Sequence, residues 1–171
     1  MKEYQVAHGP VIIEFQGKMP RALLSALIWS WNEFLACHPQ LKKNLNFQNL
    51  PVRISLGLVT DRQMKPLNLR YRGKNYATDV LSFPSFENLR FQPRLAQGPI
   101  LHLGDIIVAT GVAKKQSKEF GVSYFQELIH LAHHGFLHLL GFDHERSTQE
   151  QVLMEEMEQV LLDLYTISRR M

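Results

Sequence analysis

The sequence lacks several features that would assign it to a class at once. It has a single cysteine, Cys37, which excludes an internal disulfide. It has no apolar run near the ~18 residues that a membrane-spanning helix requires, and its first residues lack the apolar core of a signal peptide. Internal repeats, low-complexity tracts and domain linkers are also absent. We therefore expect a single cytoplasmic domain over residues 1–171, with no membrane as a partner.

The composition is that of a globular protein with a mildly basic character. Hydrophobic residues make up 45% of the chain and charged residues 20%, which is enough apolar side chain for a sizeable core. The net charge of +3 gives only a weak preference for anionic partners. One basic cluster contains no acidic residue: Arg62, Lys65, Arg70, Arg72 and Lys74. This cluster is either a solvated helix face or, beside a metal site, a contact surface for phosphates.

Apolar periodicity predicts strands and helices that alternate along the chain. The expected strands cover 10–15, 52–58, 78–84 and 101–108, and the expected helices cover 20–37, 61–72, 111–120, 123–140 and 147 onward. The segments 38–49 and 85–99 show no periodicity and predict loops, the second of them exposed. This order of elements indicates an α+β fold, with one small mixed sheet covered by helices.

Capping residues indicate where the helices begin. Asp61 is a candidate N-cap for the helix over 61–72, and Tyr71 is expected on the inner face of that helix. Ser123 and Gln126 have the spacing of a capping box at the start of the helix over 123–140.

That last helix carries the most informative stretch, His-Gly-Phe-Leu-His-Leu-Leu-Gly-Phe-Asp-His at 134–144. His134 and His138 lie one turn apart on a single helix face, so their imidazoles can share one metal ion. Gly141 falls where the helix should end and can turn the chain back, which makes His144 a third ligand. Three nitrogen ligands without a fourth protein ligand are typical of a catalytic zinc site. We expect Zn²⁺, with Ni²⁺ and other transition metals as alternatives because imidazole also suits them.

Other polar residues have less certain roles. His130 lies about 12 Å from His138 along a helix axis, too far to share an ion. We expect His130 and His133 to be partly exposed or to support the ligands from outside. Asp143 is a candidate general base, or it holds the turn. Asp105 either orients a metal ligand or caps the chain locally.

The spacing His-x3-His-x2-Gly-x2-His also occurs in metzincin proteases. Those enzymes carry a glutamate directly after the first histidine as the general base, whereas this chain has Gly135 there. A hydrolase of another substrate class, such as a peptidase, therefore remains an alternative, but the chain lacks the glutamate that would be the general base of a metzincin.

The stretch at 134–144 resembles the signature of the YbeY family, bacterial metal-dependent endoribonucleases. Two further stretches resemble the same family: Asn-x2-Tyr-Arg-Gly-Lys with Thr-Asp-Val-Leu-Ser-Phe-Pro within 68–84, and Leu-Gly-Asp-Ile at 103–106. The resemblance covers nearly the whole chain beyond Val52. It implies a mixed four-stranded sheet with a zincin-like histidine helix behind a cleft.

The resemblance also implies a function, namely cleavage of single-stranded RNA in maturation of the 3′ end of small-subunit ribosomal RNA and in ribosome quality control. His134, His138 and His144 would hold the metal, whose bound water hydrolyses the phosphodiester, and Arg72 would contact the scissile phosphate. Ribosomal RNA, the small ribosomal subunit and ribosome-associated proteins are the implied partners. A non-catalytic ribosome assembly factor with a structural zinc is the remaining alternative, which a fourth protein ligand would favour.

Overall fold

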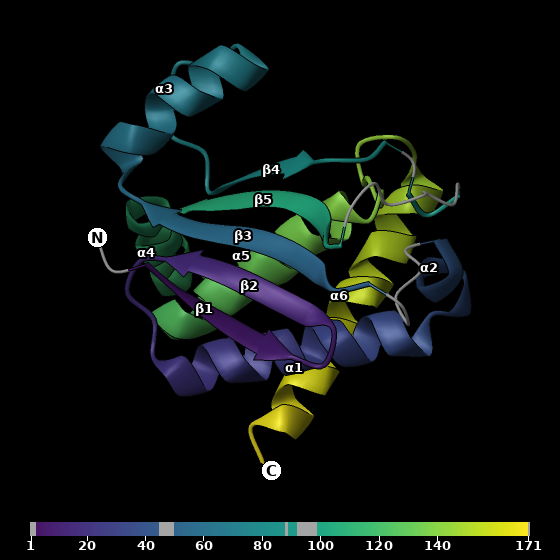
Figure 1. Cartoon of the computed structure of the whole chain (residues 1–171). Coiled ribbons are helices and arrows are strands. Elements are labelled where there is room, and N and C mark those ends of the chain that lie inside the picture. Colours follow the sequence, from purple (N-terminus) through teal and green to yellow (C-terminus); the bar gives the residue numbers. More distant parts are fainter. Residues whose placement is uncertain (1–2, 45–49, 88, 92–98, 171) are drawn as a thin grey trace.

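The computed structural model describes residues 3–44, 50–87, 89–91 and 99–170 (Figure 1). Its elements in chain order are β1 Glu3–His8, β2 Val11–Gln16, α1 Arg21–Cys37, α2 Pro39–Asn44, β3 Val52–Val59, α3 Asp61–Arg72, β4 Val80–Pro84, β5 Leu101–Ala109, α4 Thr110–Glu119, α5 Tyr124–Leu139 and α6 Thr148–Ser168. Each strand and helix expected from the sequence is present. Within the described residues, no helix has both the length and the apolar character needed to cross a membrane.

The strands form one mixed sheet in the order β1-β2-β3-β5-β4. The three inner strands are parallel, and the two edge strands β1 and β4 run antiparallel to their neighbours. The α+β fold class is therefore confirmed, but the expected number of four strands is wrong, because β1 adds a fifth. Its sequence gives little signal since β1 is an edge strand held by backbone pairing to β2 more than by burial.

Helices α1 and α5 cover one face of the sheet, and α6 packs against both of these helices (Figure 1). The core between these layers contains Trp31 of α1 stacked on Phe136 of α5, with ring centroids 4.5 Å apart. Apolar side chains from alternate positions of β2, β3 and β5 complete this core. The histidine helix α5 is thus fixed between the sheet and two other helices.

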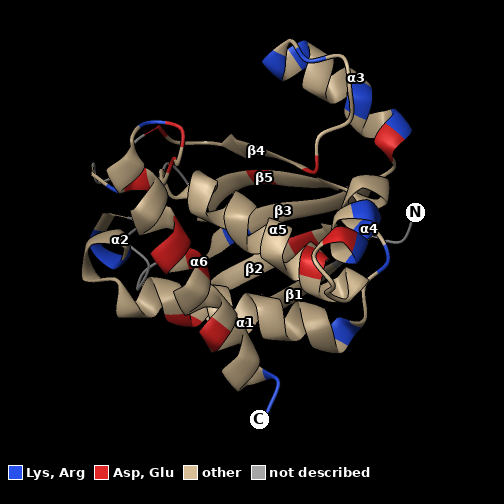
Figure 2. Cartoon of the chain, turned by 180° about the vertical axis from the view of Figure 1, so that it is seen from behind, with Lys and Arg blue, Asp and Glu red and all other residues tan. Residues whose placement is uncertain are grey.

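The opposite face of the sheet is covered at one end by α3, whose Met64 packs against Leu81 and Ala109. The rest of this face carries half-exposed side chains at alternate positions of β2, β3 and β5. Helix α3 stands at the β4 edge of the sheet and carries the basic cluster, except for Lys74, which follows the end of the helix (Figure 2). The prediction that Tyr71 lies on the inner face of α3 is wrong, because this residue is 55% exposed.

Two local expectations also need correction. Thr60, not Asp61, caps α3 in a capping box with Gln63, and the Asp61 carboxylate instead accepts hydrogen bonds from the first backbone amides of α4. The segment 85–99 is not a simple exposed loop: residues 88 and 92–98 lie outside the described residues, but Leu89 is fully buried. Arg90 beside it forms an ion pair with Glu150 at the start of α6, with nitrogen and oxygen 2.6 Å apart. Burial of Leu89 anchors this segment to the core.

Candidate metal centre

The two ends of α5 define where its histidines lie. Ser123 and Gln126 form the expected capping box at the start. At the other end Gly141 adopts a φ of 92°, the left-handed conformation that favours glycine. The Phe142 amide donates to the Leu137 carbonyl and the Gly141 amide to the His138 carbonyl, at 3.1 and 3.0 Å. This pair of bonds is a Schellman motif, and it turns the chain back toward the helix.

The turn brings His144 to the two histidines of α5. The Nε2 atoms of His134 and His138 lie 3.1 Å apart, and one nitrogen from each of the three rings lies within 4.8 Å of the others. Two nitrogens bound to one zinc ion at ~2.0–2.1 Å would be about 3.3–3.4 Å apart in tetrahedral geometry. The three histidines that were predicted from their spacing therefore lie close enough together to bind one metal ion.

The polar atoms of the three rings also fit a metal. The Nδ1 atom of His144 is buried and has no hydrogen-bond partner, which is costly unless a ligand completes the site. Burial lowers the pKa of His138 to about 4, with a further contribution from His134 and His144. The ring is therefore neutral near pH 7, as a metal ligand must be. Among the described residues, only these three histidines form such a group.

Glu158 of α6 supports the cluster from behind. Its Oε1 lies 2.7 Å from Nδ1 of His134, and its side chain is only 19% exposed. Burial acts to raise the pKa of the Glu158 carboxyl, but the hydrogen bond with His134 and the electrostatic effect of His134, His130 and His144 together hold the pKa below its usual value. This contact leaves Nε2 of His134 for the metal, the arrangement by which carboxylates orient histidine ligands. The sequence pattern did not reveal Glu158, which is one of several acidic residues in α6.

The neighbouring histidines take no part in the cluster. His130 is exposed. His133 is fully buried and contacts Ser30 of α1, with Nε2 and Oγ 3.3 Å apart. Burial lowers the pKa of His133 to about 3, so the ring stays neutral. The expectation that His133 is partly exposed or supports the ligands is wrong, because its side chain points into the α1–α5 interface.

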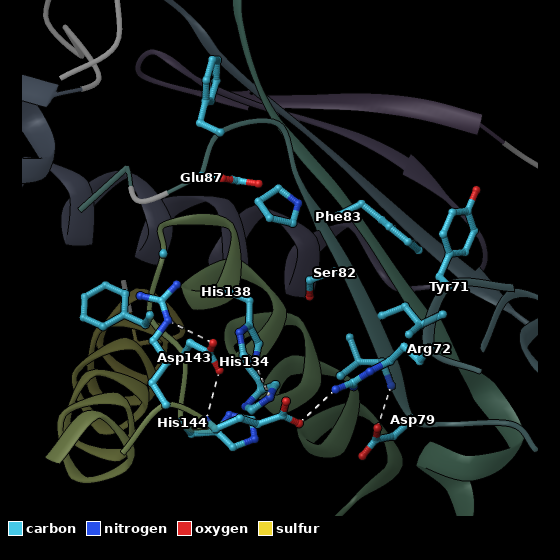
Figure 3. A pocket seen from close by; sticks show the side chains of 18 residues that line it. Tyr71, Arg72, Asp79, Ser82, Phe83, Glu87, His134, His138, Asp143 and His144 are labelled. Atoms are coloured by element: carbon cyan, nitrogen blue, oxygen red, sulfur yellow. Dashed lines mark hydrogen bonds and ion pairs between the residues drawn. The ribbon is translucent and has the colours of Figure 1, made fainter. Parts of the chain in front are cut away.

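The three histidines line one side of a cleft of about 810 Å³ between α5 and the edge strand β4 (Figure 3). Arg72, the last residue of α3, and Asp79 lie on the other side. Nη2 of Arg72 is 2.9 Å from Oε1 of Glu145, the residue after His144. Arg72 and the histidines, predicted from separate stretches, therefore share one cleft.

Asp79 is a cleft residue that the sequence did not single out. Its carboxylate accepts hydrogen bonds from Gln116, the Val80 amide and Thr78. Burial acts to raise the pKa of this carboxyl, but the hydrogen bonds together hold it below its usual value. Asp79 is therefore an ionised group that ties the start of β4 to α4.

The two other candidate carboxylates have local contacts. Asp143 accepts hydrogen bonds from the Glu145 amide at 3.0 Å and from Nε of Arg146 at 3.1 Å. These contacts correspond to the turn role of Asp143 and occupy both of its oxygens. Asp105 lies on the other face of the sheet, 3.7 Å from His102, and does not contact a histidine of the cluster.

The position of Gly135 bears on the peptidase alternative. A Cβ atom on Gly135 would lie 2.7 Å from Cγ2 of Ile106 and 3.1 Å from Oγ of Ser82. The residue after the first histidine thus packs against the sheet. A glutamate has no room there, so this chain cannot place a protease-type base at that position.

Fold and site define an α+β protein with a three-histidine metal-binding group in a cleft at the sheet edge. The family model described as Endoribonuclease YbeY matches residues 20–166. Relatives of that name include one from Persephonella marina, 39% identical over 125 residues that cover 72% of this chain and 76% of the relative. Another, from Thermodesulfovibrio yellowstonii, is 44% identical over 109 residues, 64% of each chain. The chain belongs to the YbeY family, and the resemblance predicted from its motifs is confirmed.

A solved structure agrees with this assignment. The solution structure of TM1509 from Thermotoga maritima is 26% identical in sequence and superimposes with a TM-score of 0.56. The match covers 91% of this chain and 88% of that protein.

Proposed function

We propose that this chain is a metal-dependent endoribonuclease that hydrolyses single-stranded RNA, with residues 1–171 acting as one domain. The observation that carries the proposal is the cluster of His134, His138 and His144 in a cleft that also contains Arg72. Relatives named Endoribonuclease YbeY support the reaction class. Zn²⁺ is the proposed ion, and when bound it supplies a water molecule of lowered pKa as the nucleophile.

The residues of the chain divide the remaining tasks. Glu158 holds His134 in the tautomer that presents Nε2. Arg72 binds the scissile phosphate and stabilises the charge that develops on its oxygens, a task that suits a planar, permanently charged guanidinium. The phosphate takes the place that Glu145 occupies on Arg72 in the free protein.

We further propose the particular substrate that the family resemblance implies. We place the reaction in the cytoplasm, in maturation of the 3′ end of small-subunit ribosomal RNA, with the small subunit and ribosome-associated proteins as partners. The basic cluster on α3, next to the cleft, provides cations for the phosphates that flank the scissile bond.

No observation favours the two alternatives. The peptidase lacks its base, because the sheet fills the space beside Gly135. The assembly factor with a structural zinc would need a fourth protein ligand, and the described residues offer only three histidines in the group.

Two digestions with the metal-loaded protein test the proposal, one of a short defined single-stranded RNA and one of casein. We expect cleavage of the RNA alone, abolished by His138→Ala. We also expect linear ends without a 2′,3′-cyclic phosphate, measured by mass spectrometry, because three histidine ligands leave a position on the metal for a water as the nucleophile. Cleavage of casein alone would refute the function. A cyclic phosphate that disappears on chelation would refute only the water route.

A further inference from the structure

A second hollow, of about 480 Å³, lies on the other face of the sheet beside α3. Its lining comes from β2, β3, β5, α3 and β4. Tyr71 and Phe83 line both this hollow and the metal cleft, and they form the ridge between them. A chain that leaves the cleft across this ridge enters the hollow next.

The ridge presents aromatic surface to solvent. The Tyr71 ring is edge-on to Phe83, with centroids 4.8 Å apart, and the residue is 55% exposed. The guanidinium carbon of Arg70 lies 5.4 Å from the centre of the Tyr71 ring. Figure 3 shows Tyr71 and Phe83 at the end of the cleft away from His144. Exposed aromatic rings beside arginines are the surfaces on which unpaired nucleobases stack.

The floor of the hollow is open and carries polar groups beside apolar ones. Glu14, Ser55 and Asp105 contribute oxygen atoms that can accept hydrogen bonds, and of these Glu14 also pairs with Arg53 at 3.2 Å and Asp105 lies 3.7 Å from His102. Gly57 lies two residues beyond Ser55 on β3, where its strand neighbours are Gln16 of β2 and Ile107 of β5, and a Cβ atom there would meet nothing within 4 Å. The space over Gly57 exists because this strand position carries no side chain.

The charges around the hollow fix the orientation of a nucleotide. Carboxylates on the floor repel phosphates but accept hydrogen bonds from the amino groups of bases. Arg70 over the Tyr71 ring and Arg72 in the metal cleft, both in the last turn of α3, attract phosphates. A nucleotide therefore enters with its base toward the floor and its phosphate toward α3.

We propose that this hollow is a nucleobase subsite, which binds an unpaired base of the RNA strand whose scissile phosphate lies in the metal cleft. The proposal rests on the endoribonuclease function proposed above. The floor acceptors favour adenine, cytosine and guanine, which carry amino groups, over uracil, which carries none.

Gly57 offers a direct test, because a larger side chain there fills the hollow without touching the metal cleft. Its φ is not positive, so the backbone does not require glycine, and a side chain added there meets open space. We expect Gly57→Leu to weaken binding of a short fluorescein-labelled single-stranded RNA about tenfold, measured by fluorescence anisotropy. Gly57→Ala is the matched control, since it changes the same backbone position but leaves most of the space, and it should bind as the wild type does.

Tyr71 offers a second test that a merely structural role would not pass. Tyr71→Ala should weaken RNA binding about tenfold, and Tyr71→Phe should restore it, because stacking needs the ring and not the hydroxyl. Metal content should be equal in all these variants. In the wild type, an adenine-rich strand should bind more tightly than a uracil-only strand, and Gly57→Leu should remove the difference.

The outcomes separate this subsite from the function on which it rests. If the wild type cleaves RNA while Gly57→Leu keeps wild-type affinity and base preference, the subsite is wrong and the endoribonuclease stands. If the wild type neither binds nor cleaves RNA, both proposals fall.

Discussion

At the level of single side chains, Arg72 offers a test that distinguishes a role in catalysis from a role in stability. Its only described ion pair, with Glu145, joins side chains that are 41% and 61% exposed, so the pair adds little to folding. We expect Arg72→Ala to lower the rate of RNA cleavage about 10²–10³-fold, since one electrostatic contact to the reacting group is lost. Metal content and the urea midpoint should stay near the wild-type values, with the free energy of unfolding changed by less than ~0.5 kcal/mol. A variant that unfolds would show that Arg72 is structural.

Glu158 should act on metal affinity. Glu158→Gln keeps the size of the side chain but removes the charge that faces His134. We expect metal binding about 10–100-fold weaker, measured by competition with a coloured chelator. Glu156→Gln, an exposed change on the same helix, is the control and should retain full affinity. Equal affinity in both variants would contradict the orienting role of Glu158.

Asp79 should make the free energy of unfolding depend on pH in the acidic range. Because its folded-state pKa lies below the usual value of 3.8, ionised Asp79 stabilises the fold above that value, and this stability is lost as pH falls through the lowered pKa. Asp79→Asn should therefore lose less stability than the wild type between neutral pH and about pH 3. Urea midpoints at both pH values measure the difference. Parallel pH profiles would contradict the role of this carboxylate.

The sequence predicts His134, His138 and His144 because their geometry depends on one helix turn and one glycine. Glu158 could not be found in this way. Its contact with His134 spans 24 residues and arises from packing of α6 against α5. Spacing within an element can be recognised from sequence, whereas a contact between elements depends on the tertiary fold.

At the level of elements, the end of α5 decides whether a third ligand is present. Gly141→Ala places a Cβ atom on a left-handed residue, at a cost of about 1–2 kcal/mol. We expect lower stability and weaker metal binding together, because the turn that returns His144 is strained. Gly121→Ala at the end of α4, with φ of 68°, is the control and should lose similar stability but no metal affinity. Metal affinity unchanged in both variants would show that the turn does not position the ligand.

The two elements that were not predicted from the sequence, α2 and β1, both bury little apolar surface. Helix α2 buries only Leu41 and Asn44, and β1 is an edge strand. Neither has the apolar periodicity on which sequence prediction depends. The prediction that Tyr71 is on an inner face was wrong for the opposite reason. Tyr71 matches helical periodicity, but α3 extends beyond the sheet, so its last turn does not pack against the core.

At the level of the whole molecule, the uneven charge predicts how RNA binding responds to salt. Each phosphate contact from a cation adds about 0.7 to the slope of log affinity against log salt for single strands. Lys74→Gln should weaken RNA binding at every sequence and reduce that slope by about 0.7. Lys43→Gln on α2, at the opposite end of the molecule, is the control and should change neither (Figure 1). Equal slopes in both variants would mean that RNA does not contact Lys74 of the basic cluster.

Because Glu145 forms an ion pair with Arg72, its carboxylate competes with a substrate phosphate for the Arg72 guanidinium. A small anion such as inorganic phosphate must displace Glu145 through a single contact, and it gains little from the exchange. A polynucleotide already held by the basic cluster meets Arg72 at a high effective concentration, so it displaces the carboxylate readily. The ion pair between Arg72 and Glu145 should therefore weaken binding of free phosphate to the cleft more than binding of a polynucleotide.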